Sequence, residues 1–228
     1  MKETILRLSK VSKKYNNKVV LSNVDLELNK SEFILIKGES GEGKSTLLNV
    51  IAFLEPIDSG KIFWRQKDIS TMDIKDKKNI RRSNIGYIFQ DYNLFENLTL
   101  EENLKVFLRL STNKKEFEIE KDIDKCLLKF KMSDRKKIFI KFLSGGERQR
   151  VAIMRAFLVD KSIILADEPT ANIDEINKKR IIDYFNEWKN EGKAVILVSH
   201  DDFYDDIADK VYILKKGNIS IMNRGVVE

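Results

Sequence analysis

Short apolar segments of two kinds run along the chain. Residues 24–29 alternate apolar and polar side chains, which predicts a half-buried strand, and residues 5–11 follow the same pattern more weakly. Residues 33–36, 163–166 and 194–198 are instead continuous apolar runs. Runs of this length are typical of strands that are buried on both faces of a parallel sheet. We therefore expect a parallel core with two short strands forming an antiparallel edge.

Helical spacing appears between and after these strands. Apolar residues recur every three or four positions over 119–130 and over 176–188. Alternating strands and helices predict an α/β fold with a mostly parallel sheet. The stretch of about 91–143 is mainly helical and charged, and we expect it to form a helical subdomain inserted into a core of about 1–90 and 144–228. The pattern at 211–222 predicts a closing hairpin.

The composition is that of a globular protein from a reducing compartment. The 228 residues are 42% hydrophobic, and the one cysteine, Cys126, cannot form an internal disulfide. No apolar run approaches the roughly 18 residues that a membrane span needs, and the first ten residues show no secretory signal. We therefore expect a cytosolic protein.

The net charge of +6 permits two interpretations. It could mark a nucleic-acid or anionic-membrane partner, or it could reflect lysines scattered over an ordinary surface. The densest basic stretches, 75–82 and 129–141, are interrupted by acidic or apolar residues. Because a nucleic-acid footprint needs clustered charge, we expect no nucleic-acid partner.

A phosphate-binding pattern follows the first apolar run. Residues 38–46 read GESGEGKST and match G-x-x-x-x-G-K-[ST], after a predicted strand and at the start of a predicted helix. Backbone N–H groups of such a loop and the helix N-terminus bind phosphate. Lys44 is expected to reach the β and γ phosphates of ATP, and the Ser45 hydroxyl to bind Mg²⁺. The candidate ATP-binding residues of the loop are Gly38, Glu39, Ser40, Gly41, Glu42, Gly43, Lys44, Ser45 and Thr46.

Glu42 places an acid inside a loop that holds anions. Its carboxylate either faces solvent or lowers the affinity for nucleotide. On both interpretations Glu42→Ser leaves ATP binding unchanged or makes it tighter, because a carboxylate near a triphosphate opposes binding unless a cation bridges them.

Three further candidates follow two of the buried runs. SIILADEP ends a predicted strand in two carboxylates, of which Asp167 is expected to hold Mg²⁺ and Glu168 to orient and deprotonate the attacking water. His200, the single histidine, follows the run 194–198. Ligands of open parallel sheets bind beyond the carboxyl ends of the strands, so His200 is expected to donate a hydrogen bond to the γ-phosphate.

A second candidate phosphate site lies far along the chain, in LSGGERQR. Ser144 is a good N-cap and Glu147, three residues later, completes a capping box. Gly145 and Gly146 would expose backbone N–H groups at a positive helix end. One ATP needs only one phosphate cradle per chain, so this second cradle suggests an ATP held by another copy.

The ordered set GESGEGKST, YIFQ, LSGGE, IILADEP and VSHD closely resembles the ATPase subunits of ABC transporters and covers nearly the whole chain. The resemblance implies that two cassettes pair head to tail around two ATPs, as a homodimer. The signature segment consists of Ser144, Gly145, Gly146 and Glu147. Within it, Ser144 and Gly146 would contact the γ-phosphate of an ATP bound to the other copy. ATP and Mg²⁺ are the implied cofactors.

The same resemblance assigns roles to four single residues. Tyr15 would stack on adenine, and Gln90 would bind Mg²⁺ and couple to the membrane subunit. Asp174 would lie at the dimer interface, and His200 would be the switch histidine. Hydrolysis of ATP would be carried by Glu168, His200 and Lys44.

Within the family, NLFENLTLEENL and ADEPTANID look most like the cassettes of lipoprotein-release, macrolide-export and antimicrobial-peptide systems. Ala171 and Glu147 depart from residues usual in related subgroups, as does the Lys30-Ser31 pair. The expected function is an ATPase that drives a separate membrane permease from the inner face of the cell membrane. The alternative is a soluble ABC ATPase acting on nucleic acid or ribosomes. Residues 92–96 are expected to dock the permease, unless their apolar side chains belong to the core.

Overall fold

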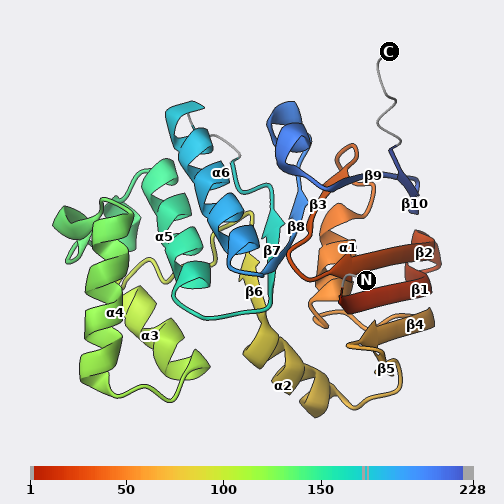
Figure 1. Cartoon of the computed structure of the whole chain (residues 1–228), viewed down its shortest axis with the longest axis horizontal. Coiled ribbons are helices and arrows are strands. Elements are labelled where there is room, and N and C mark those ends of the chain that lie inside the picture. The colour runs from red at the N-terminus through yellow and green to blue at the C-terminus, as the bar shows by residue number, and fades with distance from the viewer. Residues whose placement is uncertain (1–2, 171–172, 174, 223–228) are drawn as a thin grey trace.

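The computed structural model describes residues 3–170, 173 and 175–222, and these form an α/β fold with two sheets and two layers of helices (Figure 1). The larger sheet has the order β10-β9-β3-β8-β7-β6, and its neighbours pair in parallel except for the β9–β10 hairpin. Its strands are β3 (Phe33–Lys37), β6 (Ile85–Ile88), β7 (Ile163–Asp167), β8 (Ala194–Val198), β9 (Lys210–Lys215) and β10 (Asn218–Ile221).

The continuous apolar runs are buried on both faces because successive side chains of a strand point to opposite sides. In β3, Phe33 and Leu35 enter one hydrophobic cluster, and Ile34 and Ile36 enter the other. The strands β7 and β8 divide their residues in the same way. This confirms the parallel core that the apolar runs predict.

One face of the parallel sheet is covered by α1 (Lys44–Ile51) and by a second, antiparallel sheet of order β2-β1-β4-β5. The buried residues of α1 share a cluster with strands of both sheets, so the helix lies between them. The antiparallel sheet consists of β1 (Thr4–Tyr15), β2 (Lys18–Asn29), β4 (Ser59–Trp64) and β5 (Lys67–Asp68).

The opposite face is covered by helices (Figure 1). Phe185 and Trp188 of α6 are fully buried there, and Phe185 meets Phe33 of β3 edge to face, with ring centroids 5.9 Å apart. At the edge far from the antiparallel sheet, α3 and α4 pack on α5. These helices are α3 (Leu100–Ser111), α4 (Glu116–Lys129), α5 (Gly145–Phe157) and α6 (Glu175–Asn190), with short 3-10 turns at Ser133–Arg135, Ile140–Phe142 and Asp202–Ile207.

The structure confirms the α/β class, the antiparallel edge and the closing hairpin, and it adds elements that the apolar pattern does not predict. The edge strands β1 and β2 are 12 residues each rather than short. Helix α2 (Ile74–Asn84) has no buried residue, so no apolar stripe marks it in the sequence. The division into a core and a helical subdomain at 91–143 stays a prediction, because one hydrophobic cluster runs through α3, α4, α5 and the sheet.

Candidate active site

The phosphate loop connects β3 to α1 through backbone positions that only glycine fits. A Cβ at Gly38 would lie 2.4 Å from the Leu214 carbonyl oxygen, and one at Gly43 would lie 2.9 Å from the Val20 oxygen. Gly43 also has φ +100° and is the N-cap of α1, which begins at Lys44. The loop is therefore held closely against its neighbours while its N–H groups surround the start of the helix.

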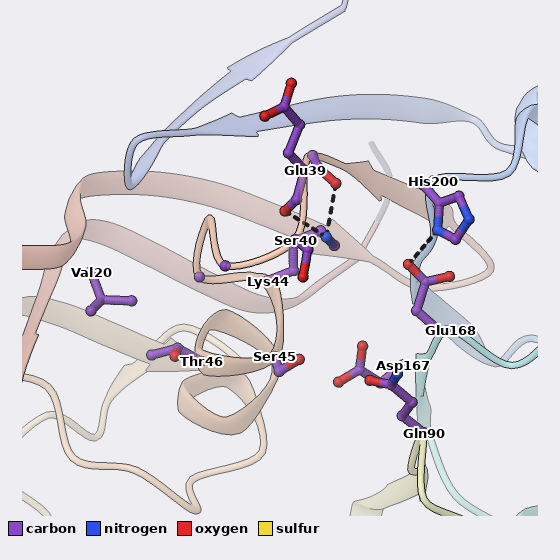
Figure 2. Close-up of a pocket in the computed structure, with 13 residues that line it drawn as sticks. Val20, Glu39, Ser40, Lys44, Ser45, Thr46, Gln90, Asp167, Glu168 and His200 are labelled. Carbon is purple, nitrogen blue, oxygen red and sulfur yellow. Dashed lines mark hydrogen bonds and ion pairs between the residues drawn. The ribbon is translucent and has the colours of Figure 1, made fainter. Parts of the chain in front are cut away.

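Lys44 folds back over the loop. Its Nζ donates to the carbonyl oxygens of Gly38 at 2.8 Å and Glu39 at 2.9 Å, as the dashed lines in Figure 2 show. The side chain of Glu39 points away from Lys44 in the same view. One ammonium thus sits at the mouth of the loop, where an anion would bind.

Asp167 ends β7 facing the start of α1. Its side chain is buried and forms a hydrogen bond with Ser45, and Gln90 lies beside it (Figure 2). Burial raises the pKa of Asp167, and the neighbouring Glu168 carboxylate raises it further, against the opposing effects of Ser45 and Lys44. A cation at this point would relieve the cost of the buried charge. Each of these three side chains offers an oxygen, the ligand type that Mg²⁺ prefers.

Glu168 is held in a fixed orientation at the end of the same strand. It has φ 46°, an uncommon backbone conformation for a non-glycine residue, and its N–H donates to the Val198 oxygen at 2.9 Å. Its Oε1 lies 3.0 Å from His200 Nδ1, and its Oε2 accepts a hydrogen bond from Ser199 Oγ at 3.2 Å. The His200 side chain is 76% exposed, against 12% for Glu168. The carboxylate is thus oriented from two sides.

Ser199 was not among the residues that the sequence singles out. It is 1% exposed, and its Oγ also accepts the Asp201 N–H at 3.1 Å. The signal that could have found it is its position at the end of β8, one residue before His200. The pocket-lining Val20 carries no such signal, because it is one apolar residue among many in β2.

These residues surround one pocket with a volume of about 570 Å³. The structure brings together nearly all of the predicted phosphate loop with the two carboxylates and the histidine (Figure 2). The pocket is lined by Val20, Gly38, Glu39, Ser40, Gly41, Gly43, Lys44, Ser45, Thr46, Gln90, Asp167, Glu168 and His200.

Two predicted site residues lie outside that lining. Tyr15, at the end of β1, is 41% exposed and has the Lys13 ammonium 5.0 Å from its ring centroid. Glu42 is partly exposed, and its Oε2 accepts a hydrogen bond from the backbone N–H of Lys216. The sequence predicts that Glu42 either faces solvent or lowers nucleotide affinity, and neither alternative includes this partner.

The signature segment is also outside the pocket of its own chain. Ser144 is the N-cap of α5 and forms the predicted capping box with Glu147: Ser144 N donates to Glu147 Oε2 at 2.9 Å, and Glu147 N donates to Ser144 Oγ at 3.3 Å. Glu147 Oε1 also accepts from Arg135 Nε at 2.9 Å. A Cβ at Gly146 would meet nothing within 4 Å, and one at Gly145 only the Tyr92 hydroxyl. The N-terminus of α5 is therefore open to an external ligand.

Asp174, expected at a dimer interface, lies outside the described residues. Within the part of the chain that the structure describes, no helix is long and apolar enough to cross a membrane. Likewise, no group of three or more His, Cys, Asp or Glu side chains among the described residues could hold a metal ion by itself. A Mg²⁺ at Asp167 would therefore take further ligands from Ser45, Gln90 and the phosphates of a nucleotide.

Comparison with known proteins places nearly the whole chain in the ABC transporter family. The ABC transporter family matches residues 21–171. The phosphonates import ATP-binding protein PhnC of Fusobacterium nucleatum is 37% identical over 95% of this chain and 91% of its own length. The lipoprotein-releasing system ATP-binding protein LolD of Treponema denticola is 34% identical over 96% of this chain and 99% of its own length.

Solved structures of ABC transporter cassettes have the same fold. The dimeric structure of the bacterial ABC transporter cassette MJ0796 superposes with a TM-score of 0.89 at 32% identity, covering 95% of this chain and 97% of that one. A second dimeric structure of MJ0796, in a post-hydrolysis state bound to ADP and Pi, gives a TM-score of 0.88 at the same identity and coverage.

Proposed function

We propose that this chain, which belongs to the ABC transporter family, is the nucleotide-binding subunit that drives a separate membrane permease. It has the ABC cassette fold and is an ABC ATPase. ATP and ADP binding follow from membership of the family, and the related cassette MJ0796 is dimeric in two solved structures.

The observation that carries the hydrolytic role is the convergence of Lys44, Asp167 and Glu168 on one pocket. The ammonium of Lys44, with the loop N–H groups, binds the β and γ phosphates of ATP. The carboxylate of Glu168 accepts the proton of the attacking water, with Ser199 and His200 fixing its orientation. Tyr15, exposed at the end of β1, is free to stack on the adenine.

Asp167, Ser45 and Gln90 would hold Mg²⁺. When bound, the ion neutralises charge that develops on the phosphate oxygens. The chain contributes a buried carboxylate whose raised pKa comes mainly from burial. A nearby cation favours the ionised form of Asp167. Binding of nucleotide with Mg²⁺ and ionisation of Asp167 would therefore favour each other.

The signature supports an ATP site shared by two copies. Ser144, Gly145 and Gly146 present the open N-terminus of α5, yet none of them lines the pocket of its own chain. A second copy in head-to-tail arrangement would place this helix end against the γ-phosphate, where its dipole and N–H groups stabilise negative charge. Asp174 is proposed to contribute to the same interface.

The permease is proposed to dock in a groove beside Gln90. This groove, of about 500 Å³, is lined by Tyr87 and Phe89, whose rings stack with centroids 3.9 Å apart. Lysine and arginine side chains also line it, and no acidic residue is among the described residues that do. The groove is lined by Ala52, Leu54, Lys78, Arg81, Arg82, Ile85, Tyr87, Phe89, Phe107, Leu110, Ser111, Arg155 and Lys161.

The composition of the groove indicates its occupant. A lining of apolar and basic side chains suits a cytoplasmic segment of the permease that carries apolar side chains flanked by at least one carboxylate. The groove also connects to the site. Arg155 donates to the backbone oxygens of Asn93 at 2.6 Å and Tyr92 at 3.0 Å, and Phe89 directly precedes Gln90. Movement of a segment seated there would therefore displace Gln90 and the residues that follow it.

We propose a position on the inner face of the cell membrane and a role in export or mechanical transduction, on the basis of the segments NLFENLTLEENL and ADEPTANID. The relatives have names of both kinds: PhnC is named for import and LolD for lipoprotein release. No nucleic-acid partner is proposed, because the densest basic stretches, 75–82 and 129–141, are interrupted by acidic or apolar residues.

Lys44→Ala tests the nucleotide site. We expect ATP affinity, measured by titration with a fluorescent ATP analogue and Mg²⁺, to fall at least tenfold, because the lysine charge meets the phosphates before the reaction begins. Lys121→Ala is the matched control, since Lys121 is an exposed lysine of α4 that does not line the pocket. Equal ATP affinity in the Lys44→Ala and Lys121→Ala variants would place the nucleotide elsewhere.

A further inference from the structure

The acid inside the phosphate loop has a partner far along the chain. Glu42 Oε2 accepts a hydrogen bond from the backbone N–H of Lys216, in the turn between β9 and β10. Lys216 and Gly217 both have positive φ, 49° and 76°, so the turn has the tight geometry that a two-residue hairpin requires. Glu42 is the one residue of the 38–46 loop that does not line the pocket.

The same turn touches the phosphate loop through a shared neighbour, β2. A Cβ at Gly217 would lie 2.7 Å from the Val20 oxygen, and one at Gly43 would lie 2.9 Å from that same oxygen. The Ser22 N–H also donates to the Gly217 oxygen at 2.8 Å. The end of the loop and the hairpin turn are therefore both packed against Val20.

We propose that Glu42 is a positioning residue: its bond to Lys216 fastens the phosphate loop to the β9–β10 turn and so holds the loop in the conformation that binds ATP. This inference rests on the proposed role of the loop in binding phosphate.

The backbone around Glu42 explains why the loop needs such a fastening. Gly41 has φ +81° and Gly43 has φ +100°, and a Cβ at Gly41 would meet nothing within 4 Å. Glycine has more conformational freedom than any other residue, so a loop with glycine on both sides of Glu42 populates many conformations unless it is anchored. The apparent affinity for a ligand falls in proportion to the fraction of the binding-competent conformation.

The direction of the Glu42 carboxylate also reduces its charge repulsion with a bound triphosphate. A charge turned to a backbone N–H outside the pocket is farther from the phosphates and is screened by solvent. The sequence alone predicts that Glu42→Ser binds ATP equally or more tightly. The bond to Lys216 predicts the opposite sign for a variant that cannot accept it.

Two variants separate the bond from the charge. Glu42→Gln removes the charge and keeps a side-chain oxygen that can accept the Lys216 N–H, whereas Glu42→Ala removes both. We expect the Kd and KM for ATP to rise about five- to tenfold in Glu42→Ala and to stay within about twofold of wild type in Glu42→Gln. The kcat of both variants stays within about twofold, because the loop acts on the substrate complex and the transition state alike.

Amide hydrogen exchange at Lys216 measures directly whether its N–H is bonded to Glu42. We expect the Lys216 amide to exchange faster in Glu42→Ala than in Glu42→Gln. Asp25→Ala is the matched control, since Asp25 Oδ1 accepts the Lys10 N–H at 2.9 Å in the antiparallel sheet and does not line the pocket. That control is expected to leave the KM for ATP unchanged, although it too loses a carboxylate bonded to a backbone N–H.

If Glu42→Ala does not fold, the α-hydroxy acid analogue of lysine at position 216 replaces the donor N–H by an ester oxygen, and it is expected to raise KM by the same factor. Equal KM values in Glu42→Ala, Glu42→Gln and wild type would overturn the inference. Tighter ATP binding in both variants, or an equal loss in both, would also overturn it, because the charge rather than the bond would then set the affinity. The Lys44→Ala result is independent of all these outcomes and decides whether the loop binds ATP.

Discussion

Glu168 combines an uncommon backbone conformation with two side-chain partners. Its φ of 46° turns the chain at the end of β7, and Ser199 and His200 contact its two carboxylate oxygens. Backbone strain of this kind persists where the surrounding structure imposes it, and it is frequent at active sites. The arrangement gives one carboxylate with a fixed direction, at the edge of the pocket that contains Lys44 and Asp167.

Glu168→Gln therefore tests the proposed general base. Glutamine keeps the shape and the hydrogen bond from Ser199 but cannot accept the proton of water. We expect turnover to fall about 10²–10⁴-fold while ATP affinity survives. Phosphate release measured at saturating ATP and Mg²⁺ gives the rate. A Glu168→Gln variant with nearly wild-type turnover would place the base elsewhere.

For individual residues, the sequence predicts most of the side chains that line the pocket. It does not predict the hydrogen bonds that hold those side chains in place. Lys44, Asp167 and Glu168 are predictable because each belongs to a local sequence pattern. Lys44 lies in a glycine-rich loop between a strand and a helix, and the two carboxylates follow a buried apolar strand. The hydrogen bonds from Ser199 to Glu168 and from Lys216 to Glu42 are not predictable, since each joins segments that only the fold brings together: Lys216 and Glu42 are 174 residues apart.

The N-terminus of α5 is stabilised locally. Burial alone would raise the pKa of Glu147, but hydrogen bonds from Arg135 and Ser144 outweigh it and hold the pKa below its usual value. Because the pKa of Glu147 is lower in the folded chain, the ionised carboxylate stabilises the fold at any pH above the pKa of glutamate in the unfolded chain, about 4.3. This contribution is lost as pH falls through the lower pKa of the folded chain. The signature helix is thus ordered before any nucleotide arrives.

Glu147→Gln should consequently change how stability depends on pH. Glutamine still completes a capping box, so only the charge interactions with Arg135 and the helix dipole are lost. We expect a loss of about 0.5–1 kcal/mol at pH 7 that persists down to about pH 4.3 and shrinks toward zero only as pH falls below that value, through the lower folded-state pKa. Urea unfolding at several pH values measures it, with Glu147→Ala as the control that loses the cap as well. A loss that is constant with pH would contradict this account of Glu147.

The segment 92–96 divides into core and surface. Leu94 and Tyr92 pack against the main hydrophobic cluster, as the alternative interpretation of this segment expects, whereas Phe95 is 58% exposed. A double replacement of Leu94 and Phe95 would therefore confound docking with folding. Phe95 alone is the residue to change.

Phe95→Ser is expected to leave the basal ATP hydrolysis of the isolated chain within about twofold, because an exposed side chain contributes little to stability. The stimulation of hydrolysis by the permease in membrane vesicles should be lost, because Phe95 lies in the segment 92–96, whose Tyr92 and Asn93 backbone oxygens accept hydrogen bonds from Arg155 of the docking groove. Phe117→Ser is the matched control, an exposed phenylalanine on α4 that lies outside both the segment 92–96 and the docking groove. Full stimulation of Phe95→Ser would show that the permease docks without this segment.

Elements with an apolar period were predictable, and those without one were not. The strands β3, β7 and β8 follow from their unbroken apolar runs. Helix α2 has only Ile74 and Ile80 as apolar residues and none that is buried, and β5 is only two residues long, so neither leaves a periodic signal. The lengths of β1 and β2 were underestimated because their register shifts at several points, which interrupts the alternation along each strand.

At the scale of the whole molecule, the proposed site is complete only when two copies meet. The pocket of one chain holds Lys44, Asp167 and Glu168, while the open helix end at Ser144 lies on α5, outside that pocket. Two solved structures of the cassette MJ0796 superpose over nearly the entire chain, and both are dimeric. The sequence predicts this arrangement from a second phosphate cradle, and the geometry of a single chain agrees with it.

The measurement that tests this account most directly is the mass of Glu168→Gln in solution. Removing negative charge opposite the γ-phosphate and blocking turnover should both favour the closed pair. With ATP and Mg²⁺, light scattering during gel filtration should give twice the mass of one chain, and without nucleotide the mass of one chain. Glu168→Gln combined with Ser144→Arg, which obstructs the signature and leaves the pocket intact, should bind ATP yet stay a monomer. A Glu168→Gln variant that binds ATP and remains a monomer would contradict the two-copy site.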